Sequence, residues 1–156
     1  MTLELDRIDG AILACLQQDG RISNQQLAER VNLSPAPCWR RVRRLEEQGL
    51  IDRYVALLNR DRLGLGVTAY VHITLTDHHA KTLAGLDAFL SRSPEVLECY
   101  SVSGEYDYLI KVIAPGIAEV EEFLMHRLLR EKAVNTTSTT FVLREKKHTT
   151  AVPLGT

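Results

Sequence analysis

The spacing of hydrophobic residues changes along this chain, and that change limits the possible folds more than any other feature. In the first third, Ile8, Ile12 and Leu16 recur at every fourth position, which is the spacing of an amphipathic helix. Apolar and polar residues instead alternate over residues 68–75, a pattern typical of a half-buried strand. The sequence therefore predicts an α+β chain, in which a helical N-terminal part precedes a part that mixes strands and helices.

Capping residues divide the first third into three helices. Asp6 is placed to cap the first helix, and Ser23 with Gln26 forms a capping box at the start of the second. Ser34 is a suitable cap for the third helix, and Gly49 is a typical stop after its last turn. The last two helices are joined by a very short turn, so the three predict a helix-turn-helix motif.

The third helix has an apolar stripe on one side and arginines on the other. At about 100° per residue, Cys38, Val42 and Leu45 share one stripe, which must face the protein core. Trp39 and Arg41 lie on opposite flanks of that stripe. Three arginines lie on the side opposite the core: Arg40, Arg43 and Arg44.

Two interpretations of this arginine face are open. It is either a solvated helix surface balanced by acidic neighbours, or a surface that reads DNA. Two features favour DNA recognition. Arginine matches phosphate oxygens and guanine edges with two hydrogen bonds, and the second helix of a helix-turn-helix enters the major groove. Trp39 is an open case, because it can either contact the groove or pack against the neighbouring helix.

The candidate DNA-binding residues fall into two groups. Side chains near the N-terminal half of the third helix are expected to reach base edges, whereas others are better placed for phosphates, which position the protein without specifying sequence. The first group is Ala36, Trp39, Arg40 and Arg43, and the second is Arg21, Ser34, Arg44 and Arg53, with Pro35 at the first helical position between them.

The remainder of the chain predicts a βαββαβ order. Residues 51–58 alternate and are predicted as a strand, which could form a wing, before the polar, turn-rich residues 59–66. Strands are then expected near 68–75, 96–103, 108–114 and 137–144, with helices around 83–90 and 117–128. This order is that of a ferredoxin-like split βαβ fold, with helices on one face of a single sheet. The other face needs a cover, which predicts a dimer.

Four segments follow from these patterns. The predicted ranges are a DNA-binding domain at 1–60, a linker at 61–66, a second domain at 67–147 and a flexible tail at 148–156.

Composition excludes several classes of protein. The net charge of −1 argues against general coating of nucleic acid, although it allows a local basic patch. No apolar run has the roughly 20 residues of a membrane-spanning helix, and the acidic N-terminus does not resemble a signal peptide, so a cytoplasmic location is expected. Three separated cysteines, each among apolar neighbours, are expected to be small buried residues rather than zinc ligands.

Three longer stretches together resemble a known family. "LDRIDGAILACLQQDGRISNQQLAERVNLSPAPCWRRVRRLEEQGLI" resembles the N-terminal half of the Lrp/AsnC (leucine-responsive regulatory protein, feast/famine) family, and "LECYSVSGEYDYLIKV" and "VNTTSTTFVLRE" are similar to its effector-domain signature and last strand. The resemblance implies a winged helix-turn-helix plus a ferredoxin-like effector-binding and oligomerisation domain. It also implies homodimers that assemble further, typically into octamers, and regulation of genes for amino-acid metabolism or transport.

The family's effector is usually an amino acid, and the resemblance places it near the "GEYD" turn. Gly104 allows a sharp turn whose backbone N–H groups suit a carboxylate. Asp107 either accepts from an ammonium group, holds the loop, or is a self-bonded turn residue. Tyr106 and Tyr108 lie on alternate faces, so one of them is expected to touch a ligand. The candidate effector-binding residues are Gly104, Tyr106, Asp107, Thr137, Ser138 and Thr139, with no cofactor and no metal.

Three other functions compete with a DNA-binding regulator. An enzyme is disfavoured because the five histidines show no metal-ligand spacing and no catalytic set has a supporting motif. An amino-acid sensor that acts through protein partners would bind the ligand but not DNA. An architectural DNA protein would bind in arrays with weak sequence preference.

Overall fold

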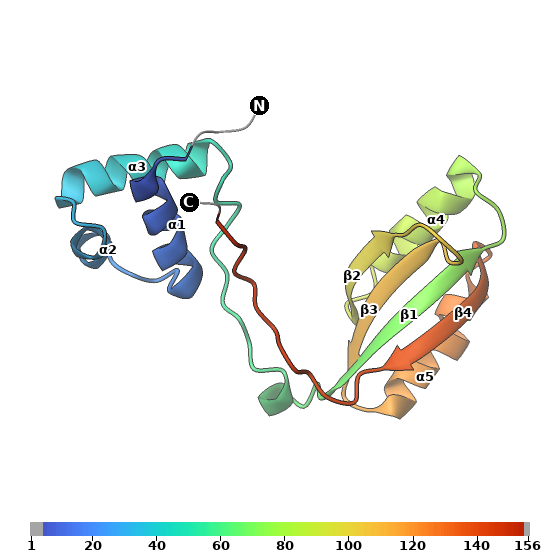
Figure 1. Cartoon of the computed structure of the whole chain (residues 1–156). Coiled ribbons are helices and arrows are strands. Elements are labelled where there is room, and N and C mark those ends of the chain that lie inside the picture. The colour runs from blue at the N-terminus through green and yellow to red at the C-terminus, as the bar shows by residue number, and fades with distance from the viewer. Residues whose placement is uncertain (1–4, 155–156) are drawn as a thin grey trace. The chain divides into compact units, whose positions relative to one another are not determined.

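Three helices form the N-terminal part of the chain: α1 (Arg7–Gln18), α2 (Asn24–Arg30) and α3 (Pro35–Glu47) (Figure 1). The structure, a computed structural model, describes residues 5–154. The predicted caps explain where these helices begin. The Asp9 N–H donates to the Asp6 carboxylate at 2.8 Å, and Ser23 and Gln26 form the predicted capping box. Ser34 is the residue before α3 as predicted, but its side chain makes no capping hydrogen bond.

The three helices enclose one hydrophobic core. Ile12 of α1 and Leu27 of α2 are buried, and Cys38 and Leu45 of α3 are completely inaccessible to solvent. Val42 is partly buried against the same cluster, so the predicted core stripe of α3 is confirmed. Gly49, with φ of +71°, ends α3 in the left-handed conformation that favours glycine.

The predicted strand at 51–58 is wrong. Within the described part of the chain these residues form no strand, and Val55, Leu57 and Leu58 are largely exposed. An alternating segment becomes a strand only where another backbone pairs with it, and no backbone among residues 5–154 does so here. The turn-rich segment that follows contains a short 3₁₀ helix, η1 (Asp61–Leu63).

The second part is a four-stranded antiparallel sheet with two helices. Its elements follow the predicted order: β1 (Val67–Leu75), α4 (Ala80–Ser91), β2 (Val96–Ser101), β3 (Tyr108–Ala114), α5 (Ile117–His126), the 3₁₀ turn η2 (Leu128–Arg130) and β4 (Val134–Phe141). The strand order is β2-β3-β1-β4 (Figure 1). Leu86 of α4 and Phe123 of α5 pack into one cluster with Val71 and Ile73 of β1, so both helices cover the same face of the sheet.

The last strand lies three residues earlier than predicted. β4 spans Val134–Phe141 rather than 137–144, and it pairs with β1 from Leu75↔Val134 to Ala69↔Phe141. The pairing ends there, although the Val142 N–H still donates to the Thr68 carbonyl at 2.9 Å, so residues 143–144 lie beyond the paired part of β4. Leu143 is accordingly 98% exposed.

The chain folds into two units whose boundaries differ from a simple division at the linker. One unit contains the N-terminal segment through Leu57 together with the C-terminal segment from Lys147, and the other contains Leu58–Lys146. Residues 148–154, predicted as part of a flexible tail, lie in contact with α1 through hydrogen bonds between Gln17 and Val152. Residues 155–156 of the predicted tail, like residues 1–4 of the predicted first domain, lie outside the described residues.

Candidate DNA-binding and effector sites

The turn between α2 and α3 fixes the start of the predicted recognition helix. Asn32 has φ of +55°, a left-handed conformation that asparagine tolerates better than most residues, and the Leu33 N–H donates to the Ala28 carbonyl at 2.9 Å. The Asn24 side chain of α2 donates to the Pro35 carbonyl in the first turn of α3 at 2.8 Å. The two helices are therefore held together by hydrogen bonds as well as by their shared core.

The outward side of α3 presents an aromatic ring beside a cation. Trp39 is 51% exposed, and the Arg43 guanidinium lies 5.3 Å from the centre of its ring. Arg43 also forms an ion pair with Glu47, one turn along the helix, at 2.8 Å. Arg40 is exposed next to them. This surface can offer guanidinium groups and an aromatic face to a partner.

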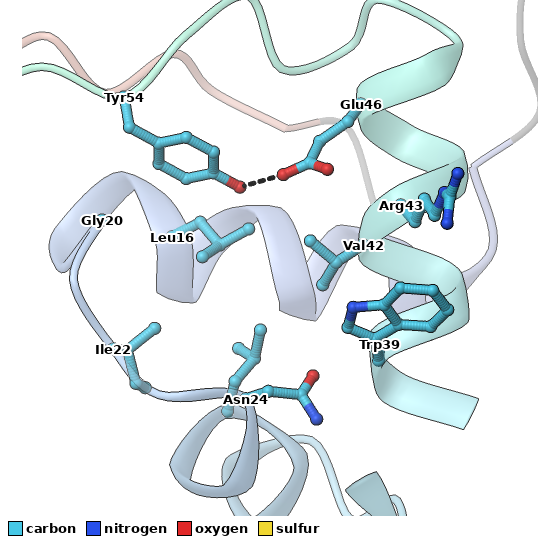
Figure 2. A pocket seen from close by; sticks show the side chains of 10 residues that line it. Leu16, Gly20, Ile22, Asn24, Trp39, Val42, Arg43, Glu46 and Tyr54 are labelled. Atoms are coloured by element: carbon cyan, nitrogen blue, oxygen red, sulfur yellow. Dashed lines mark hydrogen bonds between the residues drawn. The ribbon is translucent and has the colours of Figure 1, made fainter. Parts of the chain in front are cut away.

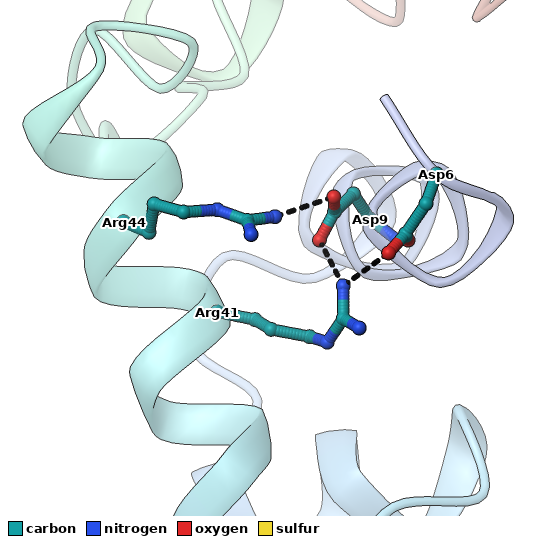
Figure 3. A network of polar contacts seen from close by, with 4 residues as sticks. All are labelled: Asp6, Asp9, Arg41 and Arg44. Atoms are coloured by element: carbon teal, nitrogen blue, oxygen red, sulfur yellow. Dashed lines mark hydrogen bonds and ion pairs between the residues drawn. The ribbon is translucent and has the colours of Figure 1, made fainter. Parts of the chain in front are cut away.

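The arginine face is divided by a contact that sequence analysis missed. Asp9 of α1, whose side chain is 2% exposed, binds the guanidinium of Arg44 at 2.5 Å and that of Arg41 at 2.8 Å (Figure 3). Arg44 was expected to face solvent with Arg40 and Arg43. It is 48% exposed, but it is bound to a buried carboxylate of α1. The signal in the sequence was the pair of acids three residues apart at the start of α1.

Asp6 completes this ionic network. Its carboxylate lies 2.6 Å from the Arg41 guanidinium. The pKa of Asp6 is lowered, first by the hydrogen bond from the Asp9 N–H and then by the hydrogen bond from Arg41. The same contacts with Asp6 and Asp9 raise the pKa of Arg41. The arginine run of α3 therefore serves two purposes, because Arg41 and Arg44 join α3 to α1 while Arg40 and Arg43 remain directed outward.

Trp39 also borders a pocket on the helical unit. This pocket, of about 450 Å³, lies between the helices and Tyr54 (Figure 2). The Tyr54 hydroxyl donates to Glu46 at 2.9 Å, and desolvation together with this hydrogen bond raises the pKa of Tyr54 to about 12. Trp39 lines this pocket with Leu27 of α2, and about half of its surface remains exposed to solvent. The lining residues are Leu16, Gly20, Ile22, Asn24, Leu27, Trp39, Val42, Arg43, Glu46 and Tyr54.

The remaining DNA-binding candidates are all at the surface. Ser34, Pro35 and Ala36 are exposed at the start of α3. Arg21 is exposed in the turn before α2, and Arg53 is exposed beyond α3, 3.4 Å from Asp52.

The loop that carries the predicted effector residues Gly104 and Tyr106 is held by Asp107. Its carboxylate accepts a hydrogen bond from the Leu75 N–H at 2.7 Å and lies 2.7 Å from His78 Nε2, while its backbone N–H donates to the Ile73 carbonyl. The His78 contact, followed by the Leu75 N–H, lowers the pKa of Asp107. Among the three expectations for this residue, the contacts match the one in which it holds the loop. Gly104 has φ of +118°, as the sharp turn requires.

The predicted effector residues lie on two different faces of the sheet. Tyr106 packs its ring against His72 at 4.6 Å between centroids, and Ser138 is paired with His72 across the strands, so these residues share the face that the helices leave open. Thr137 and Thr139 are paired with Ile73 and Val71 and therefore project toward the helices. The structure brings Tyr106 and Ser138 toward one surface but not the two threonines.

Tyr108 and the cysteines also have defined positions. Tyr108, the first residue of β3, is partly buried in the core on the helix-covered face, whereas Tyr106 precedes the strand and packs against His72 on the other face. Cys38 is buried and Cys15 partly so, but Cys99 is exposed on β2, where the expectation of a buried residue is wrong.

Neither a membrane-spanning helix nor a metal-binding cluster is found in the part of the chain that the structure describes. Among residues 5–154, no helix has the length and apolar character needed to cross a membrane. Over the same residues, no group of three or more His, Cys, Asp or Glu side chains is arranged to hold a metal ion.

Two family models match the chain, one on each part. A model described as winged helix-turn-helix DNA-binding covers residues 5–52, and one described as Lrp/AsnC ligand binding domain covers residues 68–152. The leucine-responsive regulatory protein of Salmonella typhimurium is 43% identical over 153 residues, which is 98% of this chain and 93% of that protein. Its counterpart in Escherichia coli K12 is 42% identical over the same shares.

Solved structures agree with these sequence matches. A transcriptional regulator from Neisseria meningitidis, solved in complex with L-Met, superposes with a TM-score of 0.93 at 37% identity, over 96% of this chain and 97% of that one. An AsnC family transcriptional regulator from Agrobacterium tumefaciens gives a TM-score of 0.90 at 38% identity, over the same shares. The two family models thus agree with the two parts of the structure: a helix-turn-helix with outward arginines, and a sheet covered on one face with a glycine turn. The chain belongs to the Lrp/AsnC family of DNA-binding transcriptional regulators, which are not enzymes.

Proposed function

We propose that this protein binds specific DNA sites through the outward face of α3 and that a small molecule, an amino acid, modulates this binding or the assembly of the protein. The observation that carries the proposal is the fixed position of α3. Buried Cys38 and Leu45 hold one side of it and the buried Asp9 carboxylate holds Arg41 and Arg44, while Arg40 and Arg43 are left facing outward. A rigid helix with outward-facing guanidinium groups suits hydrogen bonding to base edges.

The roles within the DNA-binding surface differ by position. Arg40 and Arg43, with Ala36 and Trp39, are proposed to face base edges in the major groove. The phosphate contacts are proposed for Arg21, Ser34 and Arg53, with Pro35 exposed at the helix start, and Arg44 would share its guanidinium between Asp9 and a phosphate. A basic surface confined to one helix explains how a chain of net charge −1 can bind DNA.

The open face of the sheet is proposed as the homodimer interface. It carries Tyr70, His72 and Tyr100, and within it Lys111 is ion-paired with Glu98 at 2.9 Å. A sheet covered by helices on one side only needs a second layer on the other, and a second copy supplies one of matching shape. Further assembly of dimers into an octamer is proposed from the family. Dimers would present two recognition helices to a roughly palindromic site.

The effector is proposed to be an amino acid, as L-Met is in the solved complex of the Neisseria relative. The exposed backbone of the Gly104 turn would receive its carboxylate, with Tyr106 and Ser138 nearby on the open face. Asp107 would support this loop from its contacts with Leu75 and His78. Thr137 and Thr139 would act only indirectly, because their side chains point toward the helices. Bound effector can shift an equilibrium between assemblies or dimer geometries only through unequal affinity for them.

The target genes are proposed to be those of amino-acid metabolism or transport. DNA as the partner implies that the protein works in the cytoplasm. The proposed division of labour remains that of a DNA-binding domain at 1–60, a linker at 61–66 and an effector-binding domain at 67–147.

Fluorescence anisotropy with the DNA upstream of the protein's own gene tests the proposal. Arg40→Ala and Arg43→Ala are each expected to weaken specific binding about tenfold to hundredfold, because each removes a base contact. Arg92→Ala, which removes the same charge from the end of α4, is the matched control and is expected to bind normally. Equal affinities for all four proteins would contradict the assignment of the recognition surface, and equal binding to unrelated DNA would favour an architectural protein.

A screen of thermal stability against the twenty amino acids tests the effector. A true effector is expected to raise the melting temperature of the wild-type protein and to change its DNA affinity. Asp107→Ala is expected to alter that response while sparing DNA binding without effector. If basal DNA binding falls as well, the division of labour between the two domains is wrong.

A further inference from the structure

The segment that follows the sheet returns to the DNA-binding unit. Residues from Lys147 onward belong to the same compact unit as α1, α2 and α3. This segment has no helix or strand of its own within the described residues, so its position depends on contacts with α1. The hydrogen bonds between Gln17 and Val152 join residues 135 positions apart in the sequence.

Gln17 recognises the backbone of this segment with both ends of its amide. The Val152 N–H donates to Gln17 Oε1 at 2.6 Å, and Gln17 Nε2 donates to the Val152 carbonyl at 3.2 Å. A carboxamide that pairs with the N–H and C=O of one residue imitates a neighbouring strand, so it holds an extended peptide in one register. Val152 itself is 62% exposed, which means that its backbone rather than its side chain is recognised.

A side-chain contact adds to this backbone recognition. Leu154 is partly buried against the helical core of the unit. With Val152, it lines one side of a pocket of about 390 Å³ whose helical side is formed by Gly10, Ala11 and Ala14 of α1. Small residues one turn apart let a chain approach the helix closely, and Gly10 is buried there.

From these contacts we infer that α1 carries a peptide-binding groove whose ligand is the protein's own C-terminal segment, residues 148–154. Gln17 clamps the backbone at Val152, and Leu154 anchors the end of the segment beside Gly10, Ala11 and Ala14. The DNA-binding unit is consequently attached to the sheet unit by two stretches of chain, one leaving at Leu57 and one returning at Lys147. Because the ligand is part of the same chain, its effective concentration is high and weak contacts suffice to hold it.

Hydrogen–deuterium exchange on the full chain tests this inference without DNA or effector. The Val152 N–H is expected to exchange slowly in the wild type and about tenfold faster in Gln17→Ala, because that variant loses both hydrogen bonds. Gln18→Ala changes the exposed neighbour on the same helix and is the matched control, with wild-type exchange expected. Leu154→Ser leaves α1 intact and is also expected to accelerate exchange across residues 148–154.

Two results would overturn the inference. One is exchange of the wild-type Val152 N–H at the rate of an unstructured peptide. The other is equal exchange in Gln17→Ala and Gln18→Ala, with Leu154→Ser unchanged as well. Failure of the proposed DNA recognition would show in a different measurement: Arg40→Ala would leave DNA affinity unchanged, whereas exchange of the C-terminal segment does not depend on Arg40.

Discussion

The carboxylate of Asp9 on α1 lies 2.5 Å from the guanidinium of Arg44 on α3, and it is the buried partner of the two. Its other oxygen binds Arg41 at 2.8 Å (Figure 3). A buried carboxylate is stable only where cations or hydrogen-bond donors compensate the loss of water, and the two arginines provide that compensation. The orientation of the DNA-binding helix is therefore tied to α1 by charge as well as by apolar packing.

Replacing Asp9 is expected to destabilise the helical unit. Asp9→Ala should lower the free energy of unfolding by about 2 kcal/mol, below the cost of breaking a fully buried pair, because both arginines keep some contact with water. Urea denaturation of the full chain measures this loss. Asp52→Ala, in which an 88% exposed carboxylate is removed, is the control and should change stability by less than about 0.5 kcal/mol. Similar stabilities for the two variants would contradict a structural role for Asp9.

Arg44, which binds Asp9, and Arg40, which faces outward, are expected to have different effects when both stability and DNA affinity are measured. Arg44→Ala should lower both, because Arg44 binds Asp9 and is also 48% exposed to a partner. Arg40→Ala should lower DNA affinity alone. If Arg44 contacts a phosphate, its loss should also reduce the slope of log affinity against log salt by about one unit. An unchanged slope would restrict Arg44 to its structural role.

Ser23, which precedes α2, and Ser34, which precedes α3, are expected to contribute differently to the free energy of unfolding. Ser23→Ala removes the hydroxyl that accepts from the Gln26 N–H in a complete capping box and should cost about 1 kcal/mol. Ser34→Ala should cost less than about 0.5 kcal/mol, because the Ser34 side chain makes no capping hydrogen bond. Thermal or urea unfolding of the two variants provides the comparison. A larger loss in Ser34→Ala would mean that its hydroxyl caps α3 in solution.

Tyr54 is expected to give the protein a dependence on alkaline pH. Its pKa is raised from 10.0 to about 12, so the folded protein keeps the phenol proton that the unfolded chain releases. The stability that this provides is complete below pH 10 and is lost as the pH rises toward 12. Absorbance of phenolate during a pH titration should show a tyrosine ionising near pH 12 that is absent in Tyr54→Phe. An unaltered titration in that variant would refute the assignment.

Asp107 is expected to make an acid-dependent contribution in the sheet unit. Its pKa is lowered from 3.8 by His78 and the Leu75 N–H, so its contribution is present above that value and is lost as the pH falls through the lowered pKa. Asp107→Asn keeps an oxygen for the Leu75 N–H but has no charge to lose. Its stability should therefore fall less steeply below about pH 4 than that of the wild type. Parallel curves for the two proteins would argue against this contribution.

Much of the fold follows from local patterns in the sequence. Helix caps, helix stops and apolar stripes depend only on neighbouring residues of one helix, so they can be predicted without the rest of the chain. Examples are the caps at Asp6 and Ser23, the stop at Gly49 and the stripe of Cys38, Val42 and Leu45. The βαββαβ order follows from period and turn residues in the same way. The prediction that α3 is the basic helix needed only the position of the arginines after a short turn.

Other features depended on pairing between distant residues. The segment at 51–58 alternates like a strand but pairs with no other backbone among the described residues, and the pairing of β4 with β1 ends at Phe141, opposite Ala69. The partners of Arg44, Asp107 and Gln17 lie 29 or more residues away, so spacing along the chain could not reveal them. Sequence determined which elements form and which residues are basic, whereas tertiary structure decided which arginines face outward and which are bound to α1, because that depends on where a buried carboxylate meets them.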